Sequence, residues 1–410
     1  MRRASLLIVI LLFASATRAR ADCGTARGSV RILSNDFYAL RIIGDAAERC
    51  AGPYLSVTHN QTTNFTNLQI PALKANPAKY TVVLISNNSM VSLLNNHLIR
   101  PLDDLVAKYG AQLGANQLVK IDGKVLAVAF MVNSQHLYYR EDVLAQAGLA
   151  VPKTYEEILN AASVIRAKGI MQYPLAGTYR PDWDLGEEFV NLYLGYGGEL
   201  FKPHSAEAAI NNATGVKVLE MMKALSEYMK PEFLTFNIEV LPPIWEAGEV
   251  AMANVWGSSA QMFLTGKGAV PAIAAVTRFA ASPTVDGGSI PATSMWWDGF
   301  SIAANISDRE ADASFQVMMH GIAPGVANSH RDAAVWITKG YKPGPTAAGV
   351  IANMQQHARS YPMVPYMSYL HNAIGSNLAK FMMGQQSATL TLGSAVDAYT
   401  TMAREAGYLE

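Results

Sequence analysis

The sequence is poor in charged residues and contains only two cysteines. Charged side chains make up 16% of its 410 residues, 32 basic against 32 acidic, whereas hydrophobic side chains make up 50%. The basic residues form no cluster, which argues against nucleic acid or an anionic membrane surface as a partner. The hydrophobic content indicates a globular chain rather than a disordered one, and the length suffices for two domains with substantial cores.

The motifs of common enzyme classes are also missing. The sequence has no G-x-S-x-G nucleophile elbow, no P-loop and no G-x-G-x-x-G that follows a strand. Its eight histidines are scattered, without a pair at helical i, i+4 spacing that would indicate zinc. We therefore expect no catalytic residues, no metal and no cofactor, and a protein that is not an enzyme.

The N-terminus has the organisation of a secretory signal peptide. Two arginines precede an apolar run over 4–16 and an A-x-A cleavage site over 19–21. We expect cleavage after Ala21 and export of the mature chain. Removal of 1–21 takes away four arginines and no acid, so 28 basic and 32 acidic residues remain, a net charge of −4. No later apolar run is long enough to cross a bilayer.

The two cysteines are Cys23 and Cys50. In an exported protein, an even pair predicts a disulfide, here between the start of the first strand and the end of the first helix. Such a loop contributes on the order of 3 kcal/mol to stability. The alternative is a lipoprotein anchored through Cys23, but Asp22 stands where lipoprotein cleavage needs a small residue. We therefore favour the disulfide.

Strands and helices alternate at the start of the mature chain. The predicted elements occupy, in order, 29–34, 37–49, 54–59, 65–75, 81–86 and 89–95. This alternation predicts an α/β lobe with a mostly parallel sheet. Further along, the pattern is mostly helical from Thr154 to about 264 and again from 324 onwards. The strands predicted in the second half occupy 248–252, 272–277 and 298–303.

The stretch Gly123–Asn160 carries a family resemblance. It reads GKVLAVAFMVNSQHLYYREDVLAQAGLAVPKTYEEILN, with a turn, β-rich runs, and a helix that Gly148 ends. Thr154 followed by Glu157 fits the capping box of the next helix. The stretch resembles the central signature of extracellular solute-binding proteins of bacterial ABC importers, in particular the sugar-binding group with the maltose- and glycerol-phosphate-type receptors. The usual Tyr-Asn-Lys-Asp stands here as Tyr139–Asp142.

Other motifs of the family follow in the same order. His97–Asp104 resembles the Gly-x-Leu-x-Pro-Leu-Asp motif of the family. Gly248–Met252 resembles the family's Gly-Lys-x-Ala-Met strand, and Trp256 follows shortly after it. The segment 76–83 lacks the usual Pro-Asp before its Val-Val. The resemblance covers nearly the whole mature chain through motifs that are individually weak but correctly ordered.

This resemblance implies an α/β fold of two lobes, the type II-like fold of periplasmic binding proteins, with a multi-strand hinge and a ligand cleft between the lobes. We expect the first lobe at 22–130 plus 296–322 and the second at 131–295 plus 323–410. The implied function is to capture a sugar, oligosaccharide or polyol by hinge closure and to deliver it to the permease subunits of an ABC importer in the inner membrane. We expect a monomer.

Candidate ligand-binding residues are polar and aromatic side chains at strand ends and hinge positions. Ligands of open α/β sheets bind beyond the carboxyl ends of the strands. Sugars stack their C–H faces on aromatic rings, and their hydroxyls donate hydrogen bonds to carboxylates and amides. The candidates are Asn35, Asp36, Phe37, Asn64, Asn87, Tyr179, Trp183, Trp256, Trp296, Trp297, Asp298, Arg331 and His371. Core packing would explain the position of any single tryptophan equally well, and helix capping would explain that of each asparagine equally well. Asp298, an acid that follows two tryptophans at a predicted hinge, is the strongest candidate.

Other interpretations stay open. The acids Asp182, Asp184, Glu187 and Glu188 could belong to a calcium site or a glycosidase pair, although the first turn of a helix is the favoured explanation. The ligand could be a small polar molecule other than a sugar, or the protein could serve a chemoreceptor. An exported glycoside hydrolase is the alternative from a different class.

Overall fold

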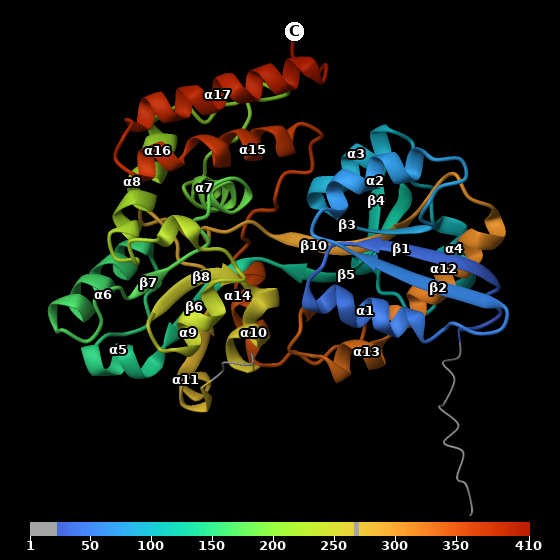
Figure 1. The fold of residues 1–410 in the computed structure, drawn as a ribbon, viewed down its shortest axis with the longest axis horizontal. Coiled ribbons are helices and arrows are strands. Elements are labelled where there is room, and N and C mark those ends of the chain that lie inside the picture. The colour runs from blue at the N-terminus through green and yellow to red at the C-terminus, as the bar shows by residue number, and fades with distance from the viewer. Residues whose placement is uncertain (1–22, 266–269) are drawn as a thin grey trace, which may run out of the picture.

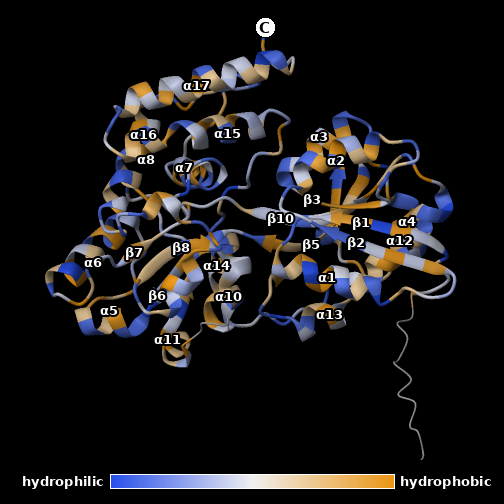
Figure 2. Cartoon of the chain, in the orientation of Figure 1, coloured by the Kyte–Doolittle hydropathy of each residue, from blue (hydrophilic) through white to orange (hydrophobic). Residues whose placement is uncertain are grey.

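The computed structural model describes residues 23–265 and 270–410, which form two α/β lobes side by side (Figure 1). The expected signal peptide and its cleavage site lie outside these residues. Hydrophobic residues concentrate on the strands at the centre of each lobe (Figure 2). Among the residues described, no helix combines the length and apolar composition needed to span a bilayer.

The first lobe is built on a seven-stranded sheet with the order β11-β5-β10-β3-β1-β2, and β4 pairs with β5. The strands are β1 (Gly28–Ser34), β2 (Leu55–Gln61), β3 (Val82–Ser86), β4 (Leu118–Ile121), β5 (Lys124–Asn133), β10 (Trp296–Ile302) and β11 (Val335–Trp336). As predicted, β1 is parallel to β2 and β3. The strand β10 returns from the second lobe and lies antiparallel between β3 and β5.

Helices cover both faces of this sheet. They are α1 (Tyr38–Glu48), α2 (Phe65–Lys74), α3 (Asn87–Asn95), α4 (Asp103–Tyr109), α12 (Asp308–Gly321) and α13 (Pro324–Ser329), with the short 3₁₀ turn η1 (Ala115–Gln117). Residues of α1 and α12 share one core with β1 and β5, and residues of α2 and α3 share another on the opposite face. Because β3 is buried on both faces, all five of its residues are buried, which explains its uninterrupted apolar run.

The second lobe has a smaller sheet with the order β7-β8-β6-β9. Its strands are β6 (Gln135–Arg140), β7 (Leu175–Ala176), β8 (Met252–Trp256) and β9 (Thr277–Ala280). The larger core, on one face, includes residues of α5 (Glu141–Ala147), α6 (Tyr155–Ala167), α7 (Trp183–Gly195), α8 (Ala213–Ser226), α15 (Met367–Asn377), α16 (Ala379–Met382) and α17 (Ala388–Glu405). A separate core contains residues of α9 (Leu241–Glu246) and α10 (Ala260–Thr265), with Ile273 of α11 (Pro271–Val276) packed against it. The remaining elements are α14 (Ala348–Gln355), η2 (Phe233–Thr235), η3 (Gly257–Ser259) and η4 (Pro345–Ala347).

Local signals in the sequence are confirmed at several positions. The Thr154 hydroxyl accepts the backbone N–H of Glu157 at 3.1 Å and caps α6. Gly148 ends α5 with a φ of 70°, a left-handed conformation that glycine adopts at little cost. Cys23 and Cys50 form the expected disulfide. A sulfur held in a disulfide cannot also carry a lipid thioether.

Three expectations about elements are corrected. The predicted strand at 272–277 is the helix α11, which begins at Pro271, and β9 follows it. The strand predicted at 248–252 begins only at its last residue and runs on to Trp256. The sequence assigns 323–336 to the second lobe, but Ala327 and Trp336 pack in the core of the first lobe because β11 pairs with β5.

Three segments connect the lobes. They are Asn133–Gln135 between β5 and β6, residues 281–295 between β9 and β10, and residues 337–347 between β11 and α14. The buried side chain of Asn353 in α14 joins the first two. Its Oδ1 accepts the N–H of Ser282, and its Nδ2 donates to Ser134 Oγ and Gln135 O, all within 2.9 Å.

Replacement of Asn353 by alanine should destabilise the protein by about 2 kcal/mol, because three buried polar partners lose their hydrogen bonds together. Urea unfolding of the mature chain measures this loss. Asn372→Ala is the matched control, since Asn372 lies exposed on α15. An Asn353→Ala variant as stable as this control would contradict the role assigned to the side chain.

Candidate ligand-binding site

Five aromatic rings gather where the second lobe meets the hinge: Trp183, Trp256, Trp296, Tyr361 and His371, here called the aromatic cluster. Trp183 stacks with Trp256 at 6.0 Å between ring centroids and with His371 at 4.9 Å. Trp296 lies 4.0 Å from Tyr361 and 6.0 Å from both other tryptophans. Trp183 has the largest exposed fraction, 36%, whereas Trp296, Tyr361 and His371 are buried.

The sheets bring these rings together. Trp256, at the end of β8, pairs with Gln135, and Trp296, at the start of β10, pairs with Asn133. Their partners are two residues apart in the first hinge segment, so residues 40 positions apart in sequence meet at one place. Trp183 begins α7, which packs along α15, and α15 supplies His371.

His371 holds the cluster from behind rather than facing a ligand. Its Nε2 donates to the Trp183 carbonyl oxygen at 2.8 Å, because a carbonyl can only accept, and its Nδ1 accepts the Tyr361 hydroxyl at 2.9 Å. Burial lowers the pKa of His371 to about 4, so the ring is neutral. The sequence includes His371 among the ligand contacts, but the structure buries it with 1% exposure.

Glu187 and Glu188 are buried side chains of α7. The sequence favours a helix N-cap and first turn for the acidic cluster 182–188, and only part of that expectation holds. Asp184 lies in the first turn and forms an ion pair with Arg180 at 3.0 Å. Asp182 precedes the helix but its side chain caps no N–H group of the helix. Burial raises the pKa of Glu187 to about 8 and that of Glu188 to about 7.

Asp298 presents a carboxylate without a protein partner. It lies on β10 beside a register shift that precedes Gly299. No hydrogen bond or ion pair joins its side chain to any residue in the described part of the chain, although it is only partly exposed. Burial raises its pKa to about 7. A partly buried carboxylate of this kind can accept hydrogen bonds from ligand hydroxyls.

The Asp298→Asn substitution should change how stability depends on pH. The unfolded chain releases this proton near pH 3.8, whereas the folded protein holds it to about pH 7, so wild-type stability falls as pH rises between these values. The stability difference, variant minus wild type, should increase over this interval by at most about 1.4 kcal/mol per pH unit and level off above pH 7. Urea unfolding at pH 4 to 8 checks this profile.

Asp397→Asn serves as the control for this titration, because Asp397 is exposed on α17. A stability difference that is constant from pH 4 to 8 for both variants would contradict the buried, unpaired state of Asp298.

The candidates on the first lobe lie at the carboxyl ends of β1 and β2, as expected. Asn35 Oδ1 accepts the N–H of Asp36, and Asp36 forms an ion pair with Arg41 at 2.6 Å. The Arg41 hydrogen bond lowers the pKa of Asp36 below its usual value. Phe37 packs partly against the first-lobe core. Asn64 is exposed, and its Oδ1 accepts a hydrogen bond from an amide one turn later in α2.

Asn87 directly follows β3, also at the carboxyl end of a strand, whereas Trp297, Tyr179 and Arg331 lie elsewhere. Asn87 is buried, and its amide accepts the N–H of Trp297 at 2.8 Å and donates to Tyr361 O at 3.3 Å, so it holds β10 to its neighbours. Trp297 packs against the first-lobe core. Tyr179 is buried in the second lobe. Arg331 is exposed near the end of α13, next to Asp332 at 3.6 Å.

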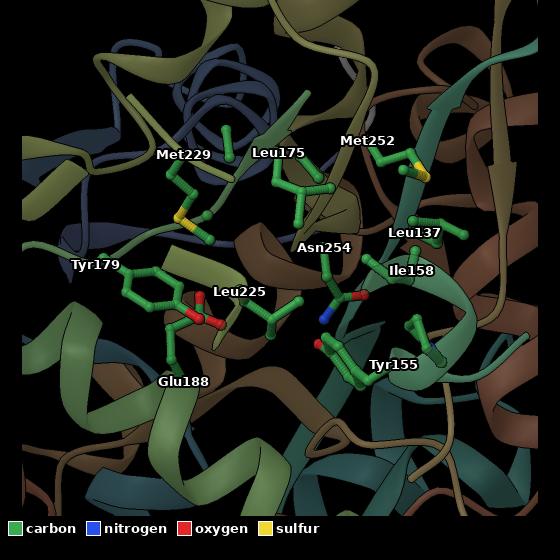
Figure 3. Close-up of a pocket in the computed structure, with 14 residues that line it drawn as sticks. Leu137, Tyr155, Ile158, Leu175, Tyr179, Glu188, Leu225, Met229, Met252 and Asn254 are labelled. Atoms are coloured by element: carbon green, nitrogen blue, oxygen red, sulfur yellow. The ribbon is translucent and has the colours of Figure 1, made fainter. Parts of the chain in front are cut away.

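Tyr179 lines a small cavity of about 30 Å³ inside the second lobe, with its hydroxyl turned towards Glu188 (Figure 3). Leucine, isoleucine and methionine make up half of the other residues that line it. With 2% of its surface exposed, Tyr179 cannot stack on a ligand between the lobes. Tyr361 is the cluster member that the sequence misses, because a lone tyrosine in a loop carries no periodic signal.

One group of potential metal ligands stands outside this site. Cys23, Cys50 and His320 bring three potential ligand atoms within 4.8 Å of one another. The disulfide removes both thiolates, so the group has no metal-binding sulfur.

Comparison with known proteins identifies the family. Residues 58–316, more than half of the chain, match the model of the bacterial extracellular solute-binding proteins. The chain belongs to this family. A solute-binding relative from Deinococcus radiodurans, a probable ABC transporter-binding protein, is 26% identical over 183 residues. That match covers 43% of this chain and 43% of the relative, so the chain spans less than half the length of that protein.

Solved structures of solute-binding proteins share the fold. Maltose-bound MalE3 from T. maritima matches with a TM-score of 0.78 at 16% identity, over 91% of this chain and 99% of that one. A ribitol complex from Agrobacterium radiobacter K84 matches with a TM-score of 0.77 at 18% identity, over 91% of this chain and 98% of that one. A D-mannitol complex from Agrobacterium vitis S4 matches with a TM-score of 0.74 at 17% identity, over 93% of this chain and 100% of that one. The two-lobe binding-protein fold predicted from the sequence is confirmed.

Proposed function

We propose that this solute-binding protein is the periplasmic substrate-binding component of an ABC importer. It captures a sugar, oligosaccharide or polyol between its lobes and presents the bound molecule to the permease subunits. Capture proceeds by closure of the lobes about the three hinge segments. The chain acts as a monomer after cleavage of its signal peptide behind Ala21.

The observation that carries this proposal is the aromatic cluster beside the unpaired carboxylate of Asp298. The cluster presents Trp183 at the junction of the lobes, and Asp298 lies two residues beyond Trp296 on the strand that enters the first lobe. An aromatic face for C–H groups and a carboxylate for hydroxyls are the two elements that carbohydrate binding requires. The maltose, ribitol and D-mannitol bound by proteins of the same fold support this ligand class.

A ligand screen tests the proposal. Maltose, ribitol, D-mannitol and a wider panel of sugars, polyols and sugar phosphates are added to the mature chain, and the melting temperature and tryptophan fluorescence are recorded. A ligand at 100 times its Kd should stabilise the protein by about 2.7 kcal/mol, because it binds only the folded state. All of the six tryptophans except Trp245 lie in the aromatic cluster or next to a hinge segment, so fluorescence should change as well. No response to any compound would count against the proposal.

A glycoside hydrolase is the weaker candidate. It requires two carboxylates on either side of a bound sugar, about 5–10 Å apart. Glu187 has no exposed surface and its Oε1 accepts hydrogen bonds from Ser294 and Trp296, so it is not placed to reach a ligand. Release of nitrophenol from a panel of chromogenic glycosides would favour the hydrolase instead.

A further inference from the structure

Two consecutive glutamates of α7 contact two different hinge segments. Glu187 Oε1 accepts the Ser294 hydroxyl at 2.7 Å and the indole N–H of Trp296 at 3.1 Å. Glu188 Oε1 accepts the side-chain amide of Gln135 at 3.0 Å and the hydroxyl of Thr178 at 2.5 Å. Ser294 precedes β10, and Gln135 begins β6, so the two acids join one helix to both segments.

The same helix begins with Trp183, the exposed ring of the aromatic cluster. Asn191, one turn beyond Glu187, accepts the N–H of Ser294 at 2.7 Å and adds a third contact to the hinge. Helix α7 therefore connects the exposed ring directly to the segments about which the lobes move. A change at Glu187 reaches the ring of Trp296 through one hydrogen bond, and a change at Glu188 reaches the first hinge segment through Gln135.

No lysine or arginine in the described part of the chain forms an ion pair with Glu187 or Glu188. Glu187 and Glu188 are 0% and 5% exposed. The ring of His371 comes within 3.9 Å of Glu187 Oε2 but is neutral. Arg180 is bound to Asp184. The other titratable groups that act on the pair are Tyr361 towards Glu187, Tyr155 and Tyr179 towards Glu188, and Asp184 on α7 itself.

We propose that Glu187 and Glu188 are positioning residues whose hydrogen bonds hold the hinge and the aromatic cluster in register, so that ligand capture weakens as rising pH ionises the two side chains. This inference rests on the proposed function. It goes further, because it assigns pH sensitivity to residues that do not touch the ligand.

The physical reason is the cost of a buried charge. A carboxylate without a cation in an apolar core is strongly disfavoured, so ionisation draws the group towards water or moves its partners. For Glu187 the partners are Ser294 and Trp296, and for Glu188 they are Thr178 and, in the hinge, Gln135. Either movement displaces a hinge segment. The two lobes then lose the geometry in which the cluster and Asp298 face one ligand.

The experiment has one arm without ligand and one with it. The first records the near-ultraviolet circular dichroism of the tryptophans and the melting temperature of the mature chain from pH 6 to 9. The second measures the Kd for maltose, ribitol and D-mannitol over the same range. The variants are Glu187→Gln, Glu188→Gln and Ser294→Ala, with Glu220→Gln as the control, because Glu220 is exposed on α8.

In wild type, the tryptophan signal should change with a component centred near pH 8, and the Kd should rise about tenfold between pH 6 and 9. Glu187→Gln should lose the component near pH 8, and Glu188→Gln the one near pH 7. Asp298 also titrates near pH 7, so part of that second component remains. The control should keep the wild-type profile.

Ser294→Ala distinguishes this role from a general structural one. The Ser294 hydroxyl stabilises the ionised form of Glu187, so its loss should move the transition near pH 8 to higher pH without abolishing it. This variant also keeps the test open if a glutamine variant does not fold. A wild-type signal that stays flat from pH 6 to 9, or a transition that persists in Glu187→Gln, would overturn the proposal. If neither these three probes nor any other compound of the ligand screen binds at any pH, the proposed function fails, while the arm without ligand still tests the hinge coupling.

Discussion

Replacement of Trp183 by alanine should raise the Kd of the ligand about 30-fold, which corresponds to about 2 kcal/mol. Trp183 is the most exposed ring of the aromatic cluster, and it is held in place by Trp256 on one side and His371 on another. A ring fixed in this manner loses little conformational freedom on binding, so most of its stacking contributes to affinity. Isothermal titration with the best compound of the ligand screen measures the change.

The variant should fold normally, because about a third of the Trp183 surface is already exposed. Its melting temperature without ligand therefore serves as an internal check. Tyr54→Ala is the matched control: Tyr54 is 72% exposed and lies on the first lobe, just before β2. Affinity should be unchanged in that control. Equal affinities of Trp183→Ala and wild type would place the ligand away from the aromatic cluster.

Removal of the disulfide should lower the free energy of unfolding by about 3.5 kcal/mol. Cys23 and Cys50 are 27 positions apart. In the chain-entropy model, a crosslink over a loop of this length lowers the conformational entropy of the unfolded chain by an amount that corresponds to about 3.5 kcal/mol. The effect acts on the first lobe, where Cys50 belongs to the core. The Cys23→Ser/Cys50→Ser double variant, unfolded in urea beside oxidised wild type, measures the loss.

Wild type treated with dithiothreitol is the second arm of this experiment. It should unfold at the same urea concentration as the double variant, because both lack the crosslink. Ligand affinity should change little, since the disulfide joins the start of β1 to the end of α1 and contacts no residue of the aromatic cluster in the described structure. A double variant as stable as the oxidised protein would show that the crosslink does not constrain the unfolded chain.

The hinge connects these predictions, because it unites the cluster, Asp298 and the two glutamates of α7. Asn353 holds two hinge segments together, and Asn87 fixes β10 against the first lobe. In these hydrogen bonds buried amides hold backbone atoms and, at Ser134, a side-chain hydroxyl. In a protein that closes about its hinge, they define which backbone atoms stay together and which are free to move.

Local features of the fold could be predicted well from the sequence. The parallel strands of the first lobe, the Thr154 cap, the Gly148 helix end and the disulfide all depend on residues near in sequence or on simple pairing. The secondary structure of the segment at 272–277 was harder to predict, because Ala-Ile-Ala-Ala-Val is compatible with a strand and with a helix. The proline that begins α11 decides it, since its fixed φ favours the first helical turn.

The site was predicted less completely. The tryptophans at positions 183, 256 and 296 were expected at the cleft and do meet at the hinge, whereas Tyr179 and His371 are buried behind it. Whether a strand-end aromatic ring faces solvent or core depends on which helix packs over it. The burial of Glu187 and Glu188 has the same origin, because an acid at a helix start is solvated unless another lobe or helix covers that turn.

By itself, the sequence determined the family, the alternation of strands and helices, the disulfide and most of the aromatic residues at the hinge. These depend on local periodicity, on turn chemistry and on motifs whose order survives in the chain. The tertiary structure alone decided that Asp298 has no side-chain partner among the described residues, that Asn87 and Asn353 hold the hinge, and that Glu187 and Glu188 lie buried against two hinge segments. Each of those depends on contacts between residues up to hundreds of positions apart, and burial by such distant partners sets both the exposure of a side chain and its charge.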